Sequence, residues 1–215
     1  MADAHGSSDL GAWVADPYLR PSRLVDWTAP EVLRLAVELG AADGDSADGE
    51  IPDIARRCFV WVRDEVPHTL DHGDEVVTVS ASDVLRERTG LCFAKSHLLV
   101  ALLRANGIRA GFVYQRLALD DERRAFCLHG LVAVDLPGHG WYRCDPRGNK
   151  PGMSAQFTPP AERLAYRANR PGETMFPKVF SEPVGIVVRA LTVFDRASVL
   201  AVSLPDAATL SELER

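Results

Sequence analysis

The stretch of residues 89–107 constrains the fold of this chain more than any other. Its apolar residues recur at intervals of three and four, the spacing of one helical face, and further apolar residues flank that face. Such a helix needs the interior of a domain, and a chain of 215 residues provides one core of sufficient size. We therefore expect a single domain over residues 1–215, built around a central and mostly buried helix.

Cys92 falls in the first turn of this predicted helix, just after Gly90. A helix start places unpaired N–H groups and the positive end of the dipole beside the sulfur, and Lys95 adds a positive charge one turn later. These features favour a reactive thiolate. A cysteine in an apolar helix is also common as a packing residue, so Cys92 taken alone leaves both roles open.

The residues before the central helix are typical of shorter helices separated by loops. Helical spacing, proline at a helix start and proline after a helix end predict three of them: 30–39, 51–66 and a short helix ending at Arg88. Ser82 with Asp83 provides a cap for the third. Residues 1–11 are small and polar, and we expect them to be disordered.

After Gly107 the apolar pattern changes to the alternation that is typical of strands. Three segments rich in β-branched and aromatic residues predict strands: 108–119, 126–136 and 141–145. Charged residues join the first two, and LPGHG joins the last two. We expect an antiparallel sheet packed on the central helix, which gives an α+β fold with helices before it.

The C-terminal extension has a weaker pattern. A proline-rich turn precedes a predicted helix around 161–167, and residues 183–191 open a last helix or strand. We expect the ordered chain to end at 199–204. Two helices beside the cleft and an additional strand are both compatible with the pattern.

The turn between the second and third strands relates His129 to Asp145. If it is centred on Pro137, these two residues lie directly opposite each other, with Cβ atoms about 5 Å apart. The carboxylate can then accept a hydrogen bond from one imidazole nitrogen and leave the other facing the thiol of Cys92. A turn longer by one residue would put the two side chains on opposite faces. Taken singly, His129 is compatible with a core histidine and Asp145 with a turn residue.

The chain resembles the core of the transglutaminase-like superfamily, and in particular its short bacterial members, in three segments: TGLCFAKSHLLVALLRANGIRAGFVYQRL, FCLHGLVAV and GWYRCDPRGNK. The resemblance covers about residues 50–160 and implies a papain-like fold with a Cys-His-Asp triad at Cys92, His129 and Asp145. Many members have a Trp two residues after the histidine, where this chain has Leu131. This part of the substrate wall therefore departs from theirs.

The triad predicts a cysteine-dependent acyl-transfer enzyme that forms a thioester and hydrolyses, exchanges or forms an amide bond. The backbone N–H of Cys92 would bind the oxyanion, and His68 or Trp61 would add a second donor, by analogy with family members that use an upstream ring. Gln115 interrupts an apolar strand and is a candidate for the substrate cleft. The alternative is a catalytically silent transglutaminase-like scaffold that binds without turnover.

Composition and charge limit the cofactors, partners and location that we expect. The four cysteines lack zinc spacing, and His68 and His72 lie in a predicted loop without a third ligand, so we expect neither a metal nor another cofactor, although a metal hydrolase stays a third hypothesis. The net charge of −6 and the lack of a dense basic cluster argue against nucleic-acid and membrane partners. Without a visible signal peptide we expect a cytoplasmic protein. The substrate class stays open between a peptide, a small amide and a carrier-bound acyl group, as does the oligomeric state.

Overall fold

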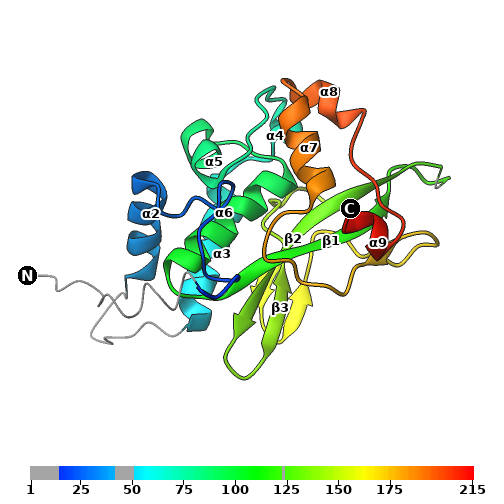
Figure 1. Ribbon diagram of the computed structural model, residues 1–215. Helices are drawn as coiled ribbons and strands as arrows, with labels where there is room; N and C mark the ends of the chain where they lie inside the picture. The colour runs from blue at the N-terminus through cyan, green and yellow to red at the C-terminus, as the bar shows by residue number, and fades with distance from the viewer. Residues whose placement is uncertain (1–14, 42–50, 123) are drawn as a thin grey trace, which may run out of the picture.

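The computed structural model describes residues 15–41, 51–122 and 124–215. Within them, helices surround α6 (Cys92–Ala105) on one side, and a four-stranded antiparallel sheet lies on the other (Figure 1). The predicted α+β arrangement, a central buried helix against an antiparallel sheet, is confirmed. The expected disorder of residues 1–11 lies outside the described residues.

The helices before α6 follow the prediction closely. They are α2 (Pro30–Gly40), α3 (Ile51–Glu65), α4 (Thr69–His72) and α5 (Ala81–Glu87). The single turn α4 lies inside a predicted loop. The cap of α5 is Ser80, whose hydroxyl accepts the N–H of Asp83 while the Asp83 carboxylate accepts the N–H of Ser80. The prediction of Ser82 as the cap is wrong, because its hydroxyl binds Asp26 instead.

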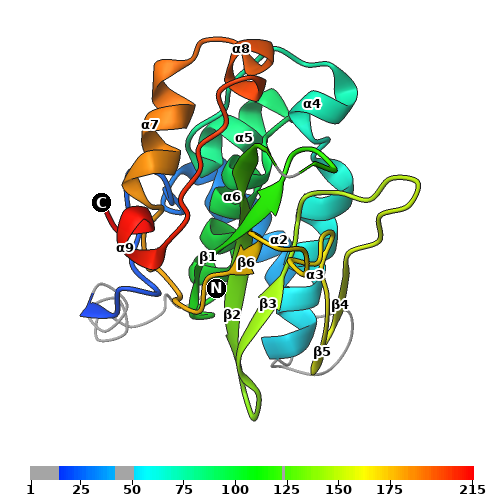
Figure 2. The ribbon, with the colours of Figure 1, turned by 90° about the vertical axis from the view of Figure 1, so that its right-hand side faces the viewer.

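The central helix α6 is buried along nearly its whole length, from Cys92 to Arg104. The helices α2, α3 and α5 pack on it from one side, and β1 and β2 from the other (Figure 2). It ends at Ala105 with Asn106 as its C-cap, and Gly107 then adopts the left-handed conformation, φ 70°, that glycine reaches without strain. A helix with apolar residues on every side is stable only in such a position.

The sheet has the strand order β3-β2-β1-β6. The predicted meander consists of β1 (Ala110–Ala118), β2 (Phe126–Leu136) and β3 (Gly140–Cys144), and β6 (Thr174–Met175) adds an edge. Alternate residues of β2, Leu128, Val132 and Val134, join the main core. Leu131 and Ala133 form a smaller apolar cluster. Because β2 is covered on both faces, polar residues on it must find partners inside the protein.

The predicted helix at 161–167 is wrong. Residues before and within it form a small hairpin, β4 (Gln156–Thr158) with β5 (Ala161–Arg163), across a turn made by Pro159 and Pro160. The two consecutive prolines fix the backbone of the turn, and residues 161–163 then pair with residues 156–158, so cross-strand hydrogen bonds replace the helical ones. The segment after β5 continues without regular structure and passes over the buried Asp145, as described below.

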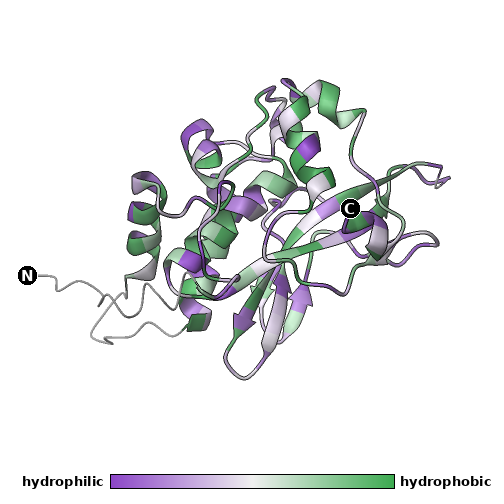
Figure 3. Cartoon of the chain, in the orientation of Figure 1, coloured by the Kyte–Doolittle hydropathy of each residue, from purple (hydrophilic) through white to green (hydrophobic). Residues whose placement is uncertain are grey.

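Three helices follow, α7 (Gly185–Val193), α8 (Ala197–Ala201) and α9 (Leu210–Leu213), so the expected end of the ordered chain at 199–204 is wrong. Helices α7 and α8 are largely hydrophobic (Figure 3), and Val193, Val199 and the C-cap residue Val202 are exposed. Among the described residues, no helix has both the length and the apolar character needed to cross a bilayer.

Candidate active site

Cys92 is the first residue of α6, and Leu91 precedes it as the N-cap. No side chain caps this helix start among the described residues, so the N–H groups of the first turn are not occupied by a side-chain acceptor. Cys92 is 8 % exposed and lines a cavity of about 480 Å³. The helix therefore presents its positive dipole end to the sulfur and to the space beside it.

His129 and Asp145 form a buried hydrogen-bonded pair. Nε2 of His129 lies 2.8 Å from Oδ2 of Asp145, and the two residues are 4 % and 0 % exposed. The carboxylate also accepts the backbone N–H groups of Arg147 at 3.1 Å and Ala165 at 3.1 Å. Burial alone would raise the pKa of Asp145, but the charge of His129 and these hydrogen bonds hold it below the ordinary value.

His129 and Cys92 line the same cavity, and the charge of Cys92 acts on the imidazole. Asp145 occupies Nε2, so Nδ1 is the nitrogen left for the sulfur. Burial by itself would lower the pKa of His129, but the negative charges of Asp145 and Cys92 and the hydrogen bond to Asp145 raise it to about 10. The protonated imidazolium is therefore the stable form at neutral pH.

Gly130 explains how β2 comes close enough to α6 for His129 and Cys92 to line one cavity. A Cβ atom at Gly130 would lie 2.8 Å from the ring of Phe93 and 3.3 Å from its Cα atom, closer than packed carbon atoms tolerate. Gly130 follows His129 in the chain, and Phe93 follows Cys92. The missing side chain thus allows the start of α6 to approach β2 beside the imidazole and the sulfur.

The predicted direct opposition of His129 and Asp145 is wrong by two residues. Leu136 opposes Gly140, so the hairpin is centred on Gly138, and Asp145 follows the end of β3. Gly138 and Gly140 take left-handed conformations, φ 76° and 67°, which let the chain turn there. A shift of two residues preserves the face of each side chain, so the carboxylate still reaches the ring along the diagonal.

Lys95 does not pair with the sulfur. Its buried ammonium donates to the carbonyl oxygens of Arg63, at 3.3 Å, and of Val66, at the C-terminal end of α3. Those carbonyls carry the negative end of the α3 dipole, so the lysine fixes α3 against α6. Burial lowers the pKa of Lys95 to about 7.

His68, a predicted oxyanion donor, lines the cavity beside Cys92. It is 8 % exposed, and its Nδ1 atom is buried without a hydrogen-bond partner among the described residues. Burial, followed by the charge of Arg147, lowers the pKa of His68 to about 3, so the imidazole is neutral and carries one N–H donor. His72 is exposed, and the described part of the chain holds no group of three His, Cys, Asp or Glu side chains arranged to bind a metal.

Trp61 and Gln115, the other two predicted site residues, do not line this cavity. Trp61 is half-buried on α3, with the guanidinium of Arg88 4.9 Å from its ring centre. Gln115 is buried and lies directly opposite His129 in the β1–β2 pair. Its amide nitrogen donates to the carbonyl of Tyr166 at 3.3 Å, and it lines a second cavity.

Tyr166 is a cavity residue that the sequence did not indicate. Its ring packs edge-on against His129, with centroids 5.0 Å apart, and the guanidinium of Arg147 lies 5.6 Å from its centre. Arg147 in turn binds Asp71 through two hydrogen bonds of 2.6 and 3.1 Å. Together these side chains shield the imidazole from water. No local signal marks Tyr166, since its place depends on the hairpin before it.

Comparison with known families identifies the relatives of this chain. The family model of the transglutaminase-like superfamily matches residues 38–146, just over half of the chain. The chain belongs to the transglutaminase-like superfamily. The resemblance of the three sequence segments is thereby confirmed. No curated protein matches the chain.

Solved structures match the chain in part. A candidate cysteine protease from Cytophaga hutchinsonii is 23% identical with a TM-score of 0.46, over 64% of this chain and 42% of that one. A candidate protease from Parabacteroides distasonis is 15% identical with a TM-score of 0.40, over 64% and 30%. The periplasmic domain of TgpA from Pseudomonas aeruginosa, bound to ethylmercury, is 21% identical with a TM-score of 0.43, over 60% and 46%. The chain spans less than half the length of these structures.

Proposed function

We propose that the protein is a cysteine-dependent acyl-transfer enzyme with Cys92 as its nucleophile. One observation carries the proposal: the imidazole of His129 is hydrogen-bonded to the buried carboxylate of Asp145 and lines, together with Cys92, a cavity of about 480 Å³. Nucleophile, acid–base group and orienting carboxylate in this arrangement perform acyl transfer on several unrelated folds. Membership of the transglutaminase-like superfamily supports the same chemistry.

In the first step, the sulfur of Cys92 attacks the carbonyl carbon of the substrate. The oxyanion that forms is placed against the backbone N–H of Cys92 at the uncapped start of α6, with the neutral imidazole of His68 as a second donor. The unpaired Nδ1 of His68 supports this assignment, because a buried polar atom without a partner indicates that a bound group completes its hydrogen bonding.

In the second step, the imidazolium of His129 gives its Nδ1 proton to the leaving amine, the C–N bond breaks and a thioester forms on Cys92. Water or a second amine then attacks the thioester and passes a proton back to His129, and the C–S bond breaks. Asp145 holds the ring in place and stabilises its positive charge throughout. The acceptor that reaches the thioester decides between hydrolysis, exchange and amide formation.

Mass spectrometry after incubation with p-nitrophenyl acetate tests the proposal. We expect a burst of p-nitrophenolate and one acetyl group, which peptide mapping places on Cys92. The adduct is lost in Cys92→Ala and kept in Cys127→Ala, a matched control because Cys127 lines the same cavity. A protein without an adduct, or with equal labelling of Cys127, contradicts the proposal and leaves a transglutaminase-like binding scaffold as the function.

A further inference from the structure

A second cavity, of about 610 Å³, adjoins the one beside Cys92, and Tyr166 and Arg167 line both. We call it the rear cavity; its polar lining consists mainly of Gln115, Arg143, Glu162, Arg163, Tyr166 and Arg167. The ring of Tyr166 is the one that packs against His129. The two cavities therefore share a wall that touches the proposed acid–base residue.

Gln115 places an unsatisfied acceptor in the rear cavity. The residue is 1 % exposed, and its Oε1 atom is buried without a hydrogen-bond partner among the described residues. It stands directly opposite His129 in the β1–β2 pair, which puts the two Cβ atoms about 5 Å apart. A buried carbonyl oxygen without a donor costs free energy, so this atom indicates a ligand with an N–H group.

The rear cavity is positively charged although the whole chain carries −6. Arg143 is neutralised by Glu162, with 2.8 Å between Nε and Oε1. Arg163 and Arg167 are exposed, and within the described ranges neither forms an ion pair. A guanidinium group binds a carboxylate through paired, charge-assisted hydrogen bonds. The chemistry that fits these two arginines is therefore an anionic group on the same ligand.

We propose that the rear cavity binds the amine half of the substrate and that this half carries a carboxylate, as an amino acid or the C-terminal residue of a peptide does. The inference rests on the proposed function, because Cys92 must first hold the acyl group. The amine donates one N–H to Gln115, and its carboxylate binds Arg163 and Arg167. Its nitrogen then forms a C–N bond with the thioester carbon, the C–S bond breaks, Cys92 leaves as thiolate and His129 takes the amine proton.

A comparison of two matched acceptors tests the inference. The full-length protein is acetylated with p-nitrophenyl acetate, and the burst counts the acylated sites. L-leucine or L-leucinamide is then supplied at equal concentrations of unprotonated amine, and the N-acetyl product per acylated site is measured by mass spectrometry. The two acceptors have the same side chain, and leucinamide has a neutral carboxamide where leucine has a carboxylate. We expect about ten-fold more transfer to leucine, about three-fold from each exposed arginine.

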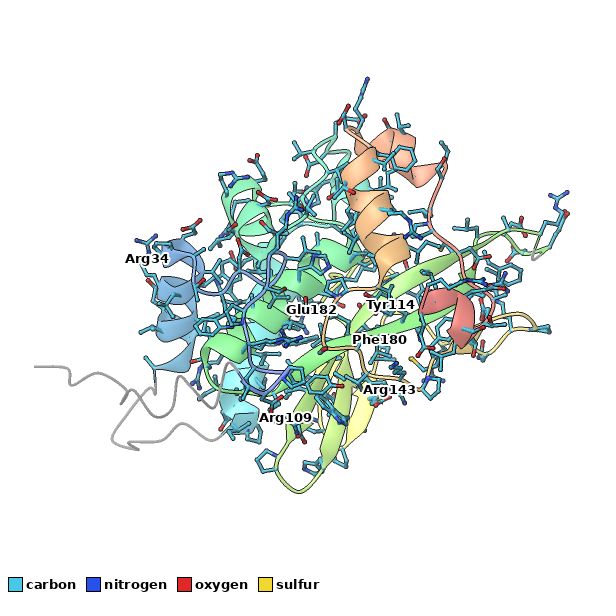
Figure 4. The ribbon with its side chains drawn as sticks, viewed as in Figure 1. Arg34, Arg109, Tyr114, Arg143, Phe180 and Glu182 are labelled. Carbon is cyan, nitrogen blue, oxygen red and sulfur yellow. The ribbon has the colours of Figure 1, made fainter. Side chains whose placement is uncertain are left out.

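Variants identify the groups responsible. Arg163→Gln reduces the preference for leucine by about three-fold, and Gln115→Met reduces transfer to both amines. Arg34→Gln is the matched control: this exposed arginine lies on α2, on the other side of the molecule from Arg143 (Figure 4), and its replacement leaves the preference unchanged.

Three results overturn the inference while the burst is intact: equal transfer to leucine and leucinamide, transfer to water alone, or a preference that Arg163→Gln does not change. The absence of a burst and of an acetyl group on Cys92 overturns the proposed function instead. The two failures are therefore distinguishable in one experiment.

Discussion

Two buried histidines line the cavity beside Cys92, and they are in opposite protonation states. His129 on β2 is hydrogen-bonded to the carboxylate of Asp145, and its pKa is raised to about 10. His68, before α4, is nearly as buried, and burial and the charge of Arg147 lower its pKa to about 3 against the opposing charge of Asp71, which lies in ion pairs with Arg147 and Lys150. Burial favours the neutral ring at both places, and the directly hydrogen-bonded carboxylate of Asp145 reverses that at His129. One cavity thus obtains a cationic acid and a neutral donor from the same residue type.

The largest effect on the reaction rate is expected when the carboxylate of Asp145 is removed. Asp145→Asn keeps the size of the side chain but loses the charge that keeps His129 protonated. We expect the rate of Cys92 acylation by an amide donor to fall by about 10⁴-fold, as for other triads that lose this carboxylate. Stopped-flow and single-turnover assays measure the rate. A fall of less than ten-fold would show that His129 does not depend on Asp145.

Substitution of His68 tests the role of the neutral histidine. His68→Phe removes the ring N–H, and we expect kcat/KM for p-nitrophenyl acetate to fall by roughly 10²-fold, the usual contribution of one oxyanion donor. His68→Gln retains an N–H donor and should recover part of the loss. The pKa of His129 measured by NMR should stay raised in both variants. An unchanged kcat/KM in His68→Phe rules out a role for His68 in oxyanion binding.

Lys95 and His129 should make the free energy of unfolding change with pH in opposite directions. The raised pKa of His129 contributes stability that is complete below about pH 6.5 and lost as the pH rises toward 10. The lowered pKa of Lys95 means that the unfolded chain binds the extra proton between about pH 7 and 10.5, so stability rises with pH there.

Lys95→Met removes the rise in stability with pH that Lys95 causes. The free energy of unfolding should then fall between pH 7 and pH 9 by about 2 kcal/mol relative to the wild type. Urea unfolding at the two pH values measures this difference, and Arg34→Gln serves as a surface control. Parallel pH profiles for wild type and Lys95→Met would mean that the buried lysine is charged in the folded protein at both values.

The smallest effect concerns the ring that covers His129. Tyr166→Leu loses an edge-on aromatic contact, and we expect the free energy of unfolding to decrease by about 1 kcal/mol beyond the loss of buried area. Tyr166→Phe keeps the ring and should retain the wild-type stability. Thermal unfolding at neutral pH compares the two. Equal losses in both variants would assign the effect to the hydroxyl group instead.

Features that depend on local pattern could be predicted from the sequence. The apolar periodicity of α6 and the alternation of β2 are local, and they set the faces on which Cys92 and His129 lie. The predicted register of the hairpin was wrong by two residues, but His129 and Asp145 still lie on the same face of the sheet, because side chains alternate with a period of two.

Features that depend on long-range packing could not be predicted. Tyr166 reaches His129 only because the segment after β5 crosses Asp145, and Lys95 binds the end of α3 only because α3 packs beside α6. The spacing of residues in the sequence predicts neither contact. The single-domain organisation, the cytoplasmic location, and the lack of nucleic-acid and membrane partners stay predictions.

NMR titration of His129 tests the central claim most directly, because the whole account depends on a carboxylate that keeps this buried imidazole protonated beside the sulfur of Cys92. Ring carbon and nitrogen shifts are followed from pH 5 to 10 in the wild type and in Asp145→Asn. We expect the wild-type ring to remain protonated at pH 8 and the ring of the variant to be neutral there. A wild-type His129 that is neutral at pH 8 would contradict the account.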